Sequence, residues 1–369
     1  MKILQIIPSL AKGGAERLVL NICNEMHSRA NVTVKLITFT ELNLYTYLLG
    51  SIDYKIVPSK YTPSIFGKST IDIEDLQREI NQFQPDIIHS HLFMSEMILS
   101  AIDFSNCKYF VHFHDNMVQF DNLRFKDVFT KKKITNWFEK QIVLKSYNKK
   151  NTNFIAISND SKQYIDTVFS DKFHKYLLNN AIELGRFNSI QLSDNTDRIV
   201  MIGSLFEKKG HVLAIETIKE LHDRGLKIYL DLLGIGPKKQ ILQDLIDNFG
   251  LNDYIILHGN VDYPEEYLKE SFLYFHTAIY EPFGLVLLEA MACGLPVVCT
   301  DAIGNRDLIV EGVNGYIHSD RNCKALADTI EKIQKDKILR ERLGAGAKQF
   351  SQNFGIKEYV DSLLKIYAL

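Results

Sequence analysis

The hydrophobic pattern of this chain alternates short apolar runs with longer segments in which apolar residues recur every three or four positions. The short runs are continuous and rich in β-branched residues, which is typical of strands buried on both faces of a parallel sheet. The segments between them, such as residues 14–29 and 73–83, have the period of a helix. The first six runs are KILQIIP (2–8), VTVKLITF (32–39), YKIVP (54–58), PDIIHSH (85–91), KYFVHFH (108–114) and NFIAIS (153–158).

The alternation is interrupted by the polar stretch 188–197 and then restarts. Strands that alternate with helices predict parallel sheets with right-handed crossovers, and 369 residues suit two domains better than one core. We therefore predict an α/β protein with two Rossmann-like domains facing a central cleft, residues 1–187 and 198–354. An amphipathic helix at about 355–369 can pack back on the first domain. The later runs are RIVMIGSL (198–205), KIYLDLLG (227–234), YIILHG (254–259), FLYFHTA (272–278) and PVVCT (296–300).

Composition and charge narrow the class of protein. A net charge of -2 gives no reason to expect a nucleic-acid partner. The five cysteines form no CxxC pair, so we expect reduced thiols. The N-terminal apolar run is too short for a secretory signal, and no apolar stretch approaches the length of a membrane span. These features predict a cytoplasmic protein.

The segment EPFGLVLLEAMACGLPVV (281–298) keeps two glutamates in an otherwise apolar run. It follows a predicted strand, and ligands of open α/β sheets bind beyond the carboxyl ends of strands. The pattern predicts a buried helix that starts near Gly284 and ends at Gly294, with its N-terminal amides available to a phosphate. Ribose hydroxyls would satisfy a buried Glu289, and sugar hydroxyls would suit Glu281. The alternative is that Glu281 caps the helix and Glu289 pairs with a neighbouring Lys or Arg.

This segment resembles the signature of retaining GT-B glycosyltransferases of family 4, also called glycosyl transferases group 1. The resemblance covers nearly the whole chain in the order typical of the family. Besides the Glu-x7-Glu segment, the similar segments are SLAKGGAERLVLNI, VHFHDN, FIAIS, LLNNAIELGRF, IGSLFEKKG, LLGIGPKKQIL and GVNGYI. The resemblance implies the GT-B fold and a nucleotide-sugar donor, and it implies that neither a cofactor nor a metal is needed.

The resemblance also implies roles for particular residues. Glu281 and His114 are expected to contact the donor sugar, and Glu289 the ribose. Lys209 is expected to neutralise the diphosphate. Backbone amides near the sugar and diphosphate are expected from Phe283, Gly284 and Leu285 in the second domain and from Gly13 and Gly14 in the first.

The chain departs from the family pattern at several positions. Ser204 stands where the family has a basic residue beside the phosphate, and Lys208 is a candidate to compensate for it. Ala181 and Glu183 replace the Gly and Asp of the N-G-I-D segment. Asp307 is a candidate for the acidic residue that follows the last strand of the cleft.

Two His-x-His pairs, His89 with His91 and His112 with His114, end two predicted strands. Residues two apart on a strand share a face, which is also how a metal site is built. The interpretation we prefer places His89 and His91 as polar residues at a cleft rim and gives His114 a functional role. A nicotinamide-dependent oxidoreductase is disfavoured, because the glycine spacing that it needs is absent.

Residues 124–150 are rich in Lys and Arg and include Trp137 and Phe138. A basic helix with aromatics suits an anionic membrane surface or a lipid-phosphate acceptor. A solvated helix whose aromatics pack inward is the alternative.

Taken with the resemblance, these observations predict retaining transfer of a hexose from a nucleotide-diphosphate sugar to a saccharide or lipid-linked saccharide, in the synthesis of cell-surface polysaccharides or glycoconjugates. The donor that we expect is a UDP-sugar. The retaining members of the family are thought to use same-face attack, so no enzyme nucleophile is expected. Two alternatives stay open: a GT-B sugar-nucleotide 2-epimerase and a non-catalytic sugar-nucleotide-binding subunit. The predicted location is cytoplasmic, and the basic segment 124–150 is a candidate for peripheral attachment to the membrane.

Overall fold

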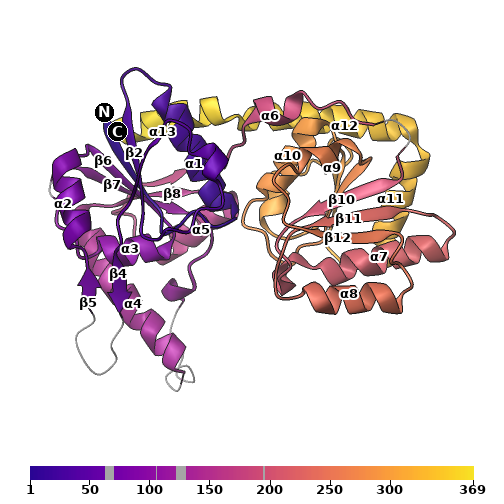
Figure 1. Ribbon diagram of the computed structural model, residues 1–369, viewed down its shortest axis with the longest axis horizontal. Helices are drawn as coiled ribbons and strands as arrows, with labels where there is room; N and C mark the ends of the chain where they lie inside the picture. The colour runs from indigo at the N-terminus through magenta and orange to yellow at the C-terminus, as the bar shows by residue number, and fades with distance from the viewer. Residues whose placement is uncertain (63–69, 105, 122–129, 194–195) are drawn as a thin grey trace. The chain divides into compact units, whose positions relative to one another are not determined.

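The computed structural model describes residues 1–62, 70–104, 106–121, 130–193 and 196–369, and the chain divides into two compact units (Figure 1). Unit 1 consists of Met1–Asn180 with Ile356–Leu369, and unit 2 of Ala181–Gly355. Each unit is built on a sheet of parallel strands, with helices in the connections. The predicted α/β class is therefore confirmed.

The described part of unit 1 contains a seven-stranded sheet in the order β3-β2-β1-β6-β7-β8-β9, and β4 and β5 form a separate antiparallel pair. Every pairing in the large sheet is parallel. The strands are β1 Lys2–Ile6, β2 Thr33–Thr38, β3 Asp53–Ile56, β4 Lys60–Thr62, β5 Thr70–Asp72, β6 Ile87–His91, β7 Lys108–Phe113, β8 Asn153–Ala156 and β9 Lys175–Leu177.

Helices cover both faces of this sheet, and β1 shows how the sequence assigns them. Leu4 and Ile6 pack with apolar side chains of α2 and α3. Gln5 lies between them and points to the opposite face, where its side chain bonds Tyr367 of α13. Helix α13 packs against α1 on that face (Figure 1). The helices are α1 Gly14–His27, α2 Glu74–Phe83, α3 Phe93–Leu99, α4 Lys131–Lys150, α5 Asn159–Val168 and α13 Ile356–Ala368, with short 3-10 turns η1 Thr46–Leu48 and η2 Val118–Phe120.

Unit 2 contains a six-stranded parallel sheet in the order β12-β11-β10-β13-β14-β15, counted over its described residues. Its strands are β10 Arg198–Ile202, β11 Tyr229–Leu233, β12 Ile255–Gly259, β13 Leu273–His276, β14 Val297–Thr300 and β15 Gly315–His318. Its helices are α6 Leu184–Asn188, α7 His211–Asp223, α8 Lys239–Asn248, α9 Glu265–Lys269, α10 Leu285–Cys293, α11 Cys323–Lys335 and α12 Lys337–Ser351, with 3-10 turns η4 Glu207–Lys209, η5 Gly304–Asp307 and η6 Gln352–Phe354.

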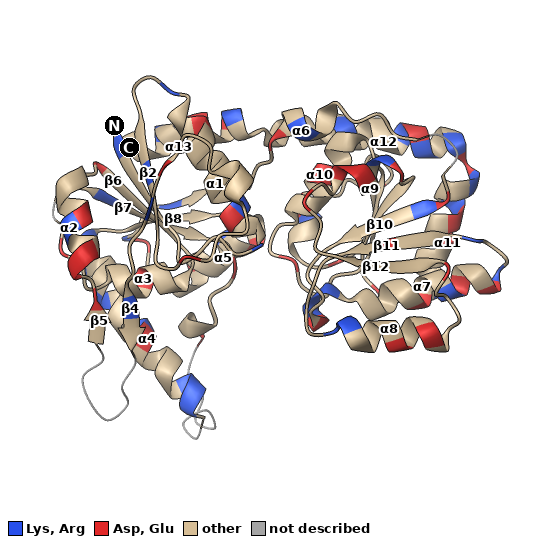
Figure 2. Ribbon diagram, viewed as in Figure 1, with Lys and Arg blue, Asp and Glu red and all other residues tan. Residues whose placement is uncertain are grey.

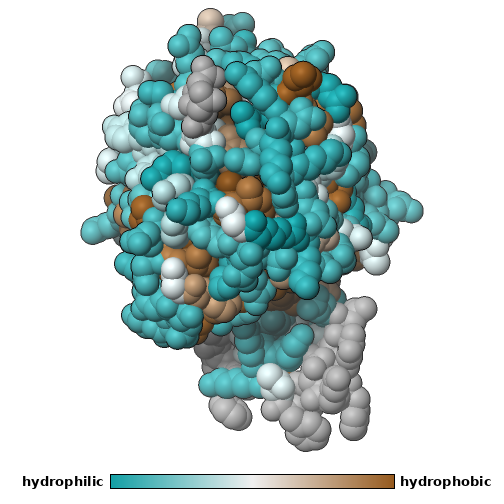
Figure 3. Space-filling view, turned by 90° about the vertical axis from the view of Figure 1, so that its right-hand side faces the viewer, coloured by the Kyte–Doolittle hydropathy of each residue, from teal (hydrophilic) through white to brown (hydrophobic). Residues whose placement is uncertain are grey.

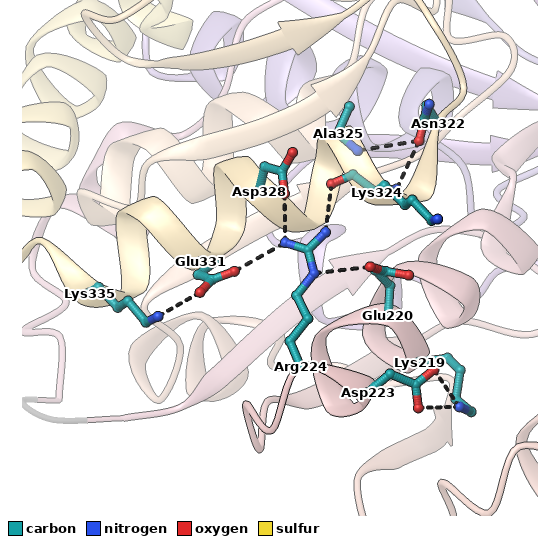
Figure 4. Close-up of polar contacts among 10 residues, drawn as sticks. All are labelled: Lys219, Glu220, Asp223, Arg224, Asn322, Lys324, Ala325, Asp328, Glu331 and Lys335. Atoms are coloured by element: carbon teal, nitrogen blue, oxygen red, sulfur yellow. Dashed lines mark hydrogen bonds and ion pairs between the residues drawn. The ribbon is translucent and has the colours of Figure 1, made fainter.

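Arg224 ties two helices of unit 2 together at its surface (Figure 4). Its guanidinium donates to Glu220 of α7 and to Asp328 and Glu331 of α11, at 2.6–3.1 Å. The planar guanidinium can serve three carboxylates at once, which a lysine could not do in this geometry.

The space-filling view in Figure 3 shows a mainly hydrophilic face with small, separate hydrophobic patches.

The boundary between the units differs from the sequence prediction. Unit 2 begins at Ala181 rather than after the polar stretch 188–197. Phe187 is fully buried, and Ile182 donates to the Phe354 carbonyl at 2.9 Å within unit 2. The polar stretch is anchored in the same unit, since Ser193 bonds Lys269. A prediction based only on local polarity therefore put the boundary too far along the sequence, because these long-range contacts are not visible in the composition.

Candidate active site

The glutamate segment forms a strand-loop-helix unit in unit 2. Strand β13 ends at His276, the loop carries Glu281, and α10 starts at Leu285 with Gly284 as its N-cap. Gly284 has φ 92° and Gly294, which ends the helix, has φ 91°. Both values are in the left-handed region that favours glycine. The predicted start and end of this helix are confirmed.

Glu281 is the centre of a buried ionic cluster. Its Oε2 lies 2.5 Å from Nζ of Lys209 and 3.2 Å from Nε2 of His276. Burial alone would raise the pKa of Glu281, but Lys209 and His276 outweigh burial and hold this pKa at about 2. The N-cap residue of α10 is Gly284, and the Glu281 carboxylate faces Lys209 and His276; the alternative in which Glu281 caps the helix stays untested.

His276 was missed by the sequence reasoning. It is fully buried on β13, and burial lowers its pKa, although Glu281 opposes that shift. The available signal was its position at the end of a strand, five residues before Glu281. Nε2 of His276 and Nζ of Lys209 approach the same oxygen of Glu281, Oε2. On the other side of the ring, Nδ1 of His276 lies 3.4 Å from Oη of Tyr274.

A backbone clamp fixes the Glu281 loop against the end of β14. Glu281 donates to the Ala302 carbonyl at 3.1 Å and accepts from Gly304 at 3.0 Å. A Cβ at Gly304 would lie 2.4 Å from the Pro282 carbonyl carbon, so only glycine allows this approach. Ile303 between them has φ 68°, a strained value for a β-branched residue. Asp307 lies at the end of the following turn η5.

Lys209 is positioned by the turn that follows β10. Gly210 has φ 68°, and a Cβ there would lie 1.9 Å from the Thr277 carbonyl oxygen. The turn that carries Lys209 and Gly210 therefore packs against the end of β13 without room for a side chain at position 210. Arg321, which sequence reasoning also missed, donates to the carbonyls of Thr277 and Ala278 at 3.0 Å and so braces the same strand end.

The remaining predicted donor-binding residues of unit 2 lie on the same elements. Ser204 follows β10, and its carbonyl accepts from Phe206 at 2.7 Å. Nζ of Lys208 lies 5.9 Å from the centroid of the Tyr280 ring. Glu289 is in the second turn of α10 and is 2% exposed, and Phe283 is 2% exposed. Their roles toward a ligand stay predictions.

In unit 1 the Gly-Gly loop joins β1 to α1. Gly13 is the extended N-cap and Gly14 the first helical residue. A Cβ at Gly13 would lie 2.3 Å from Oε2 of Glu16, and Tyr45 donates to the Gly13 carbonyl at 3.0 Å. The loop is thus closely packed, and burial raises the pKa of Glu16.

The two His-x-His pairs lie on neighbouring strands, because β6 pairs with β7. His89, His91 and His112 are fully buried, and His114 is 8% exposed. The interpretation of His89 and His91 as rim residues is therefore wrong. Within the described ranges, one atom from each of His89, His91 and His112 lies within 4.8 Å of the others, a grouping that suits a metal ion.

Family models match almost the whole chain. "Glycosyltransferase Family 4" matches residues 12–184, and "Glycosyl transferases group 1" matches residues 186–350. The fold and the matched sequence define a glycosyltransferase of the GT-B class. The chain belongs to glycosyltransferase family 4.

Individual relatives agree with this class. An uncharacterised glycosyltransferase of Methanocaldococcus jannaschii is 28% identical over 250 residues, 64% of this chain and 63% of that protein. A lipopolysaccharide core biosynthesis glycosyltransferase of Rhizobium meliloti is 29% identical over 171 residues, 46% of this chain and 49% of that protein. The matches thus span less than two thirds of these relatives. The Anabaena protein HepE, solved with UDP and glucose, superposes with a TM-score of 0.80 at 19% identity, covering 100% of this chain and 99% of that chain.

Proposed function

We propose that this glycosyltransferase moves a hexose from a UDP-sugar to a saccharide or lipid-linked saccharide with retention of configuration. The observation that carries the proposal is the Lys209–Glu281–His276 cluster beside the N-terminus of α10. It places a cation and the N-terminus of helix α10 next to a carboxylate, which is the combination that a sugar diphosphate needs.

Each residue has a part in this reaction. Glu281 stays ionised at neutral pH and accepts hydrogen bonds from the donor sugar. As the sugar–phosphate bond breaks, negative charge grows on the leaving diphosphate, and Lys209 with the amides near Gly284 stabilises it. Glu289 accepts from the ribose, and His114 of unit 1 bonds the donor sugar. Same-face attack by the acceptor requires no enzyme nucleophile, and the fixed cation replaces a metal at the diphosphate.

The donor assignment is supported by HepE, which was solved with UDP and glucose. The acceptor class is supported by the lipopolysaccharide core relative and fits a place in the synthesis of polysaccharides or glycoconjugates. The 2-epimerase alternative is not favoured, because the matched families and the relatives above are glycosyltransferases.

An anionic membrane surface is the proposed docking partner, through α4. The first turn of α4 carries Lys131, Lys132 and Lys133, and Figure 2 shows this end in blue. Trp137 and Phe138 are 40% and 49% exposed, so the alternative with inward-packed aromatics is wrong for both. Residues 124–129 of the predicted basic segment lie outside the described residues. No helix in the described ranges has both the length and the apolar character needed to cross a bilayer.

The direct test is a donor screen followed by product analysis. UDP-, GDP- and ADP-sugars are offered in the presence of EDTA, and nucleotide release and the anomeric configuration of the product are measured. We expect turnover of a UDP-sugar. We also expect the new linkage to have the same anomeric configuration as the donor. Tight UDP binding without hydrolysis or transfer would instead favour a non-catalytic subunit, and activity restored only by a divalent ion would contradict metal independence.

A further inference from the structure

A continuous chain of buried hydrogen bonds runs through unit 1 from His114 to the C-terminal helix. His114 Nε2 lies 2.9 Å from His91 Nδ1, and His91 Nε2 lies 2.7 Å from Gln5 Oε1. Gln5 Nε2 then donates to Tyr367 Oη at 3.2 Å, and this oxygen lies 2.5 Å from His89 Nδ1. Every member apart from His114 is at most 1% exposed.

The ring geometry favours a hydrogen-bonded stack over a metal site. The rings of His89 and His112 are stacked with 7° between their planes, and those of His112 and His114 with 12°. A ligated ion lies near the plane of each imidazole, because the nitrogen lone pair lies in that plane. Parallel, stacked rings therefore cannot direct their lone pairs at one ion without rotating.

All four histidines are held neutral. Burial, together with neighbouring histidines, lowers the pKa of His89, His91 and His112 well below the ordinary value. Burial lowers the pKa of His114 to about 3. A neutral imidazole has one N–H donor and one acceptor nitrogen, so each ring in the chain has a defined polarity.

Gln5 sets that polarity, because its amide nitrogen can only donate and its oxygen can only accept. Its oxygen faces His91 Nε2, so His91 carries its proton on Nε2 and presents a bare Nδ1. That bare Nδ1 must accept from His114, which therefore carries its proton on Nε2. The other nitrogen of His114, Nδ1, is buried, has no partner among the described residues and is left as an acceptor.

We propose that Gln5, His91 and Tyr367 are positioning residues that fix His114 in the Nε2–H tautomer and so keep its Nδ1 as an acceptor. This inference rests on the proposed role of His114 in binding the donor sugar. The C-terminal helix contributes to this chain of hydrogen bonds through Tyr367, whose hydroxyl accepts from the Gln5 amide nitrogen at 3.2 Å.

The tautomer is measured directly in the full-length, ligand-free protein labelled with ¹⁵N-histidine. Long-range ¹H–¹⁵N spectra distinguish protonated from bare ring nitrogens, and a His114→Ala variant assigns the His114 signals. We expect the proton on Nε2 in the wild type. In Gln5→Leu the constraint on His91 is gone, and we expect the His114 signals to shift toward a mixture of tautomers.

Kinetics with the UDP-sugar that the wild type turns over test the positioning role. We expect Gln5→Leu and Tyr367→Phe to lower kcat by about tenfold, the factor that one ordinary hydrogen bond supplies. The affinity for UDP, which lacks the sugar, should stay within about twofold, whereas a general loss of structure would weaken it too. The matched control is Tyr359→Phe, because Tyr359 is a buried tyrosine of the same helix whose hydroxyl has no partner in the described structure.

The outcomes separate this inference from the proposed function. A wild-type His114 with its proton on Nδ1, or a Gln5→Leu spectrum identical to the wild type, overturns the relay. One equivalent of metal bound to His89, His91 and His112 in the purified protein also overturns it. If the tautomer changes while kcat does not, the positioning role is wrong. Unchanged activity of His114→Ala instead overturns the donor-binding role on which the inference rests.

Discussion

Nζ of Lys209 and Oε2 of Glu281 are 2.5 Å apart in unit 2, with only 15% and 10% of the two side chains exposed. The residues are 72 positions apart in the sequence, and each comes from a loop at the end of a parallel strand. A pair this buried loses much of its hydration, so removing one partner leaves an uncompensated charge in the interior. The pair therefore serves both the stability of unit 2 and the proposed binding of a diphosphate.

Glu281→Gln should destabilise the protein at neutral pH by on the order of 2–3 kcal/mol. The pKa of Glu281 is about 2 in the folded protein against an ordinary 4.5. A carboxylate with a lowered pKa contributes stability above its unfolded pKa and loses it as the pH falls toward the folded pKa. The difference in the free energy of unfolding between the wild type and Glu281→Gln should therefore be largest at pH 7 and shrink between about pH 4.5 and pH 2.

Thermal unfolding of both proteins across this pH range measures that difference. Glu207→Gln is the control, since Glu207 pairs with Lys238 at 2.5 Å in the same unit but is 72% exposed. A screened surface pair should change stability far less. Equal effects of the two substitutions would contradict the importance of burial at Glu281.

Lys209→Met should weaken UDP binding by about 10- to 100-fold, because a charge-assisted hydrogen bond contributes roughly 1.5–3 kcal/mol. Lys208→Met tests whether the neighbouring lysine compensates for Ser204. Nζ of Lys208 lies 5.9 Å from the Tyr280 ring centroid rather than at Glu281, so we expect a smaller loss. Isothermal titration with UDP measures the affinity of both variants. A larger loss of affinity in Lys208→Met than in Lys209→Met would assign the diphosphate contact to Lys208 instead.

Glu289→Ala should weaken binding of UDP and of the UDP-sugar alike, by roughly 1.5–3 kcal/mol, because hydrogen bonds to the ribose hydroxyls are lost. Glu289→Gln keeps the shape and one acceptor, so it should lose less. Titration of both variants with UDP and with UDP-sugar provides the measurement. If a folded Glu289→Ala protein binds both ligands as the wild type does, the ribose assignment is wrong.

Gly210→Ala isolates the effect of a close backbone contact. Gly210 and Gly225 have φ values of 68° and 84°, but only at Gly210 would a Cβ meet other atoms, 1.9 Å from the Thr277 carbonyl oxygen. Gly225→Ala should cost about 1–2 kcal/mol for the left-handed backbone alone. Gly210→Ala should cost more and should also weaken UDP binding, because the turn carrying Lys209 must shift. Thermal unfolding and UDP titration compare the two, and equal stability losses would contradict the contact.

The sequence predicted the parts of this protein that depend on local pattern. Strand–helix alternation predicted the α/β class, and the glycines around the apolar helix predicted the ends of α10. What it missed depends on long-range contact. His276 stands at the end of a predicted strand, but the local pattern does not show its contact with Glu281 or the contact of Arg321 with the end of β13. Gln5 and Tyr367 are bonded across a separation of 362 residues. The boundary at Ala181 is set by the contact of Ile182 with Phe354, which the polar composition of 188–197 could not reveal.

The last prediction concerns the membrane surface proposed for α4. Lys131, Lys132 and Lys133 contribute about 1 kcal/mol each near an anionic surface, and salt screens this attraction. Changing the three to Ser should abolish sedimentation with phosphatidylserine vesicles at low salt and leave UDP affinity unchanged. The control replaces Lys324, Lys332 and Lys335 of α11 with Ser, which removes the same charge from unit 2. Trp137 is the sole tryptophan, so its emission should shift to shorter wavelength when wild-type protein meets vesicles. Equal binding by both triple variants, or no binding at any salt concentration, would contradict docking through α4.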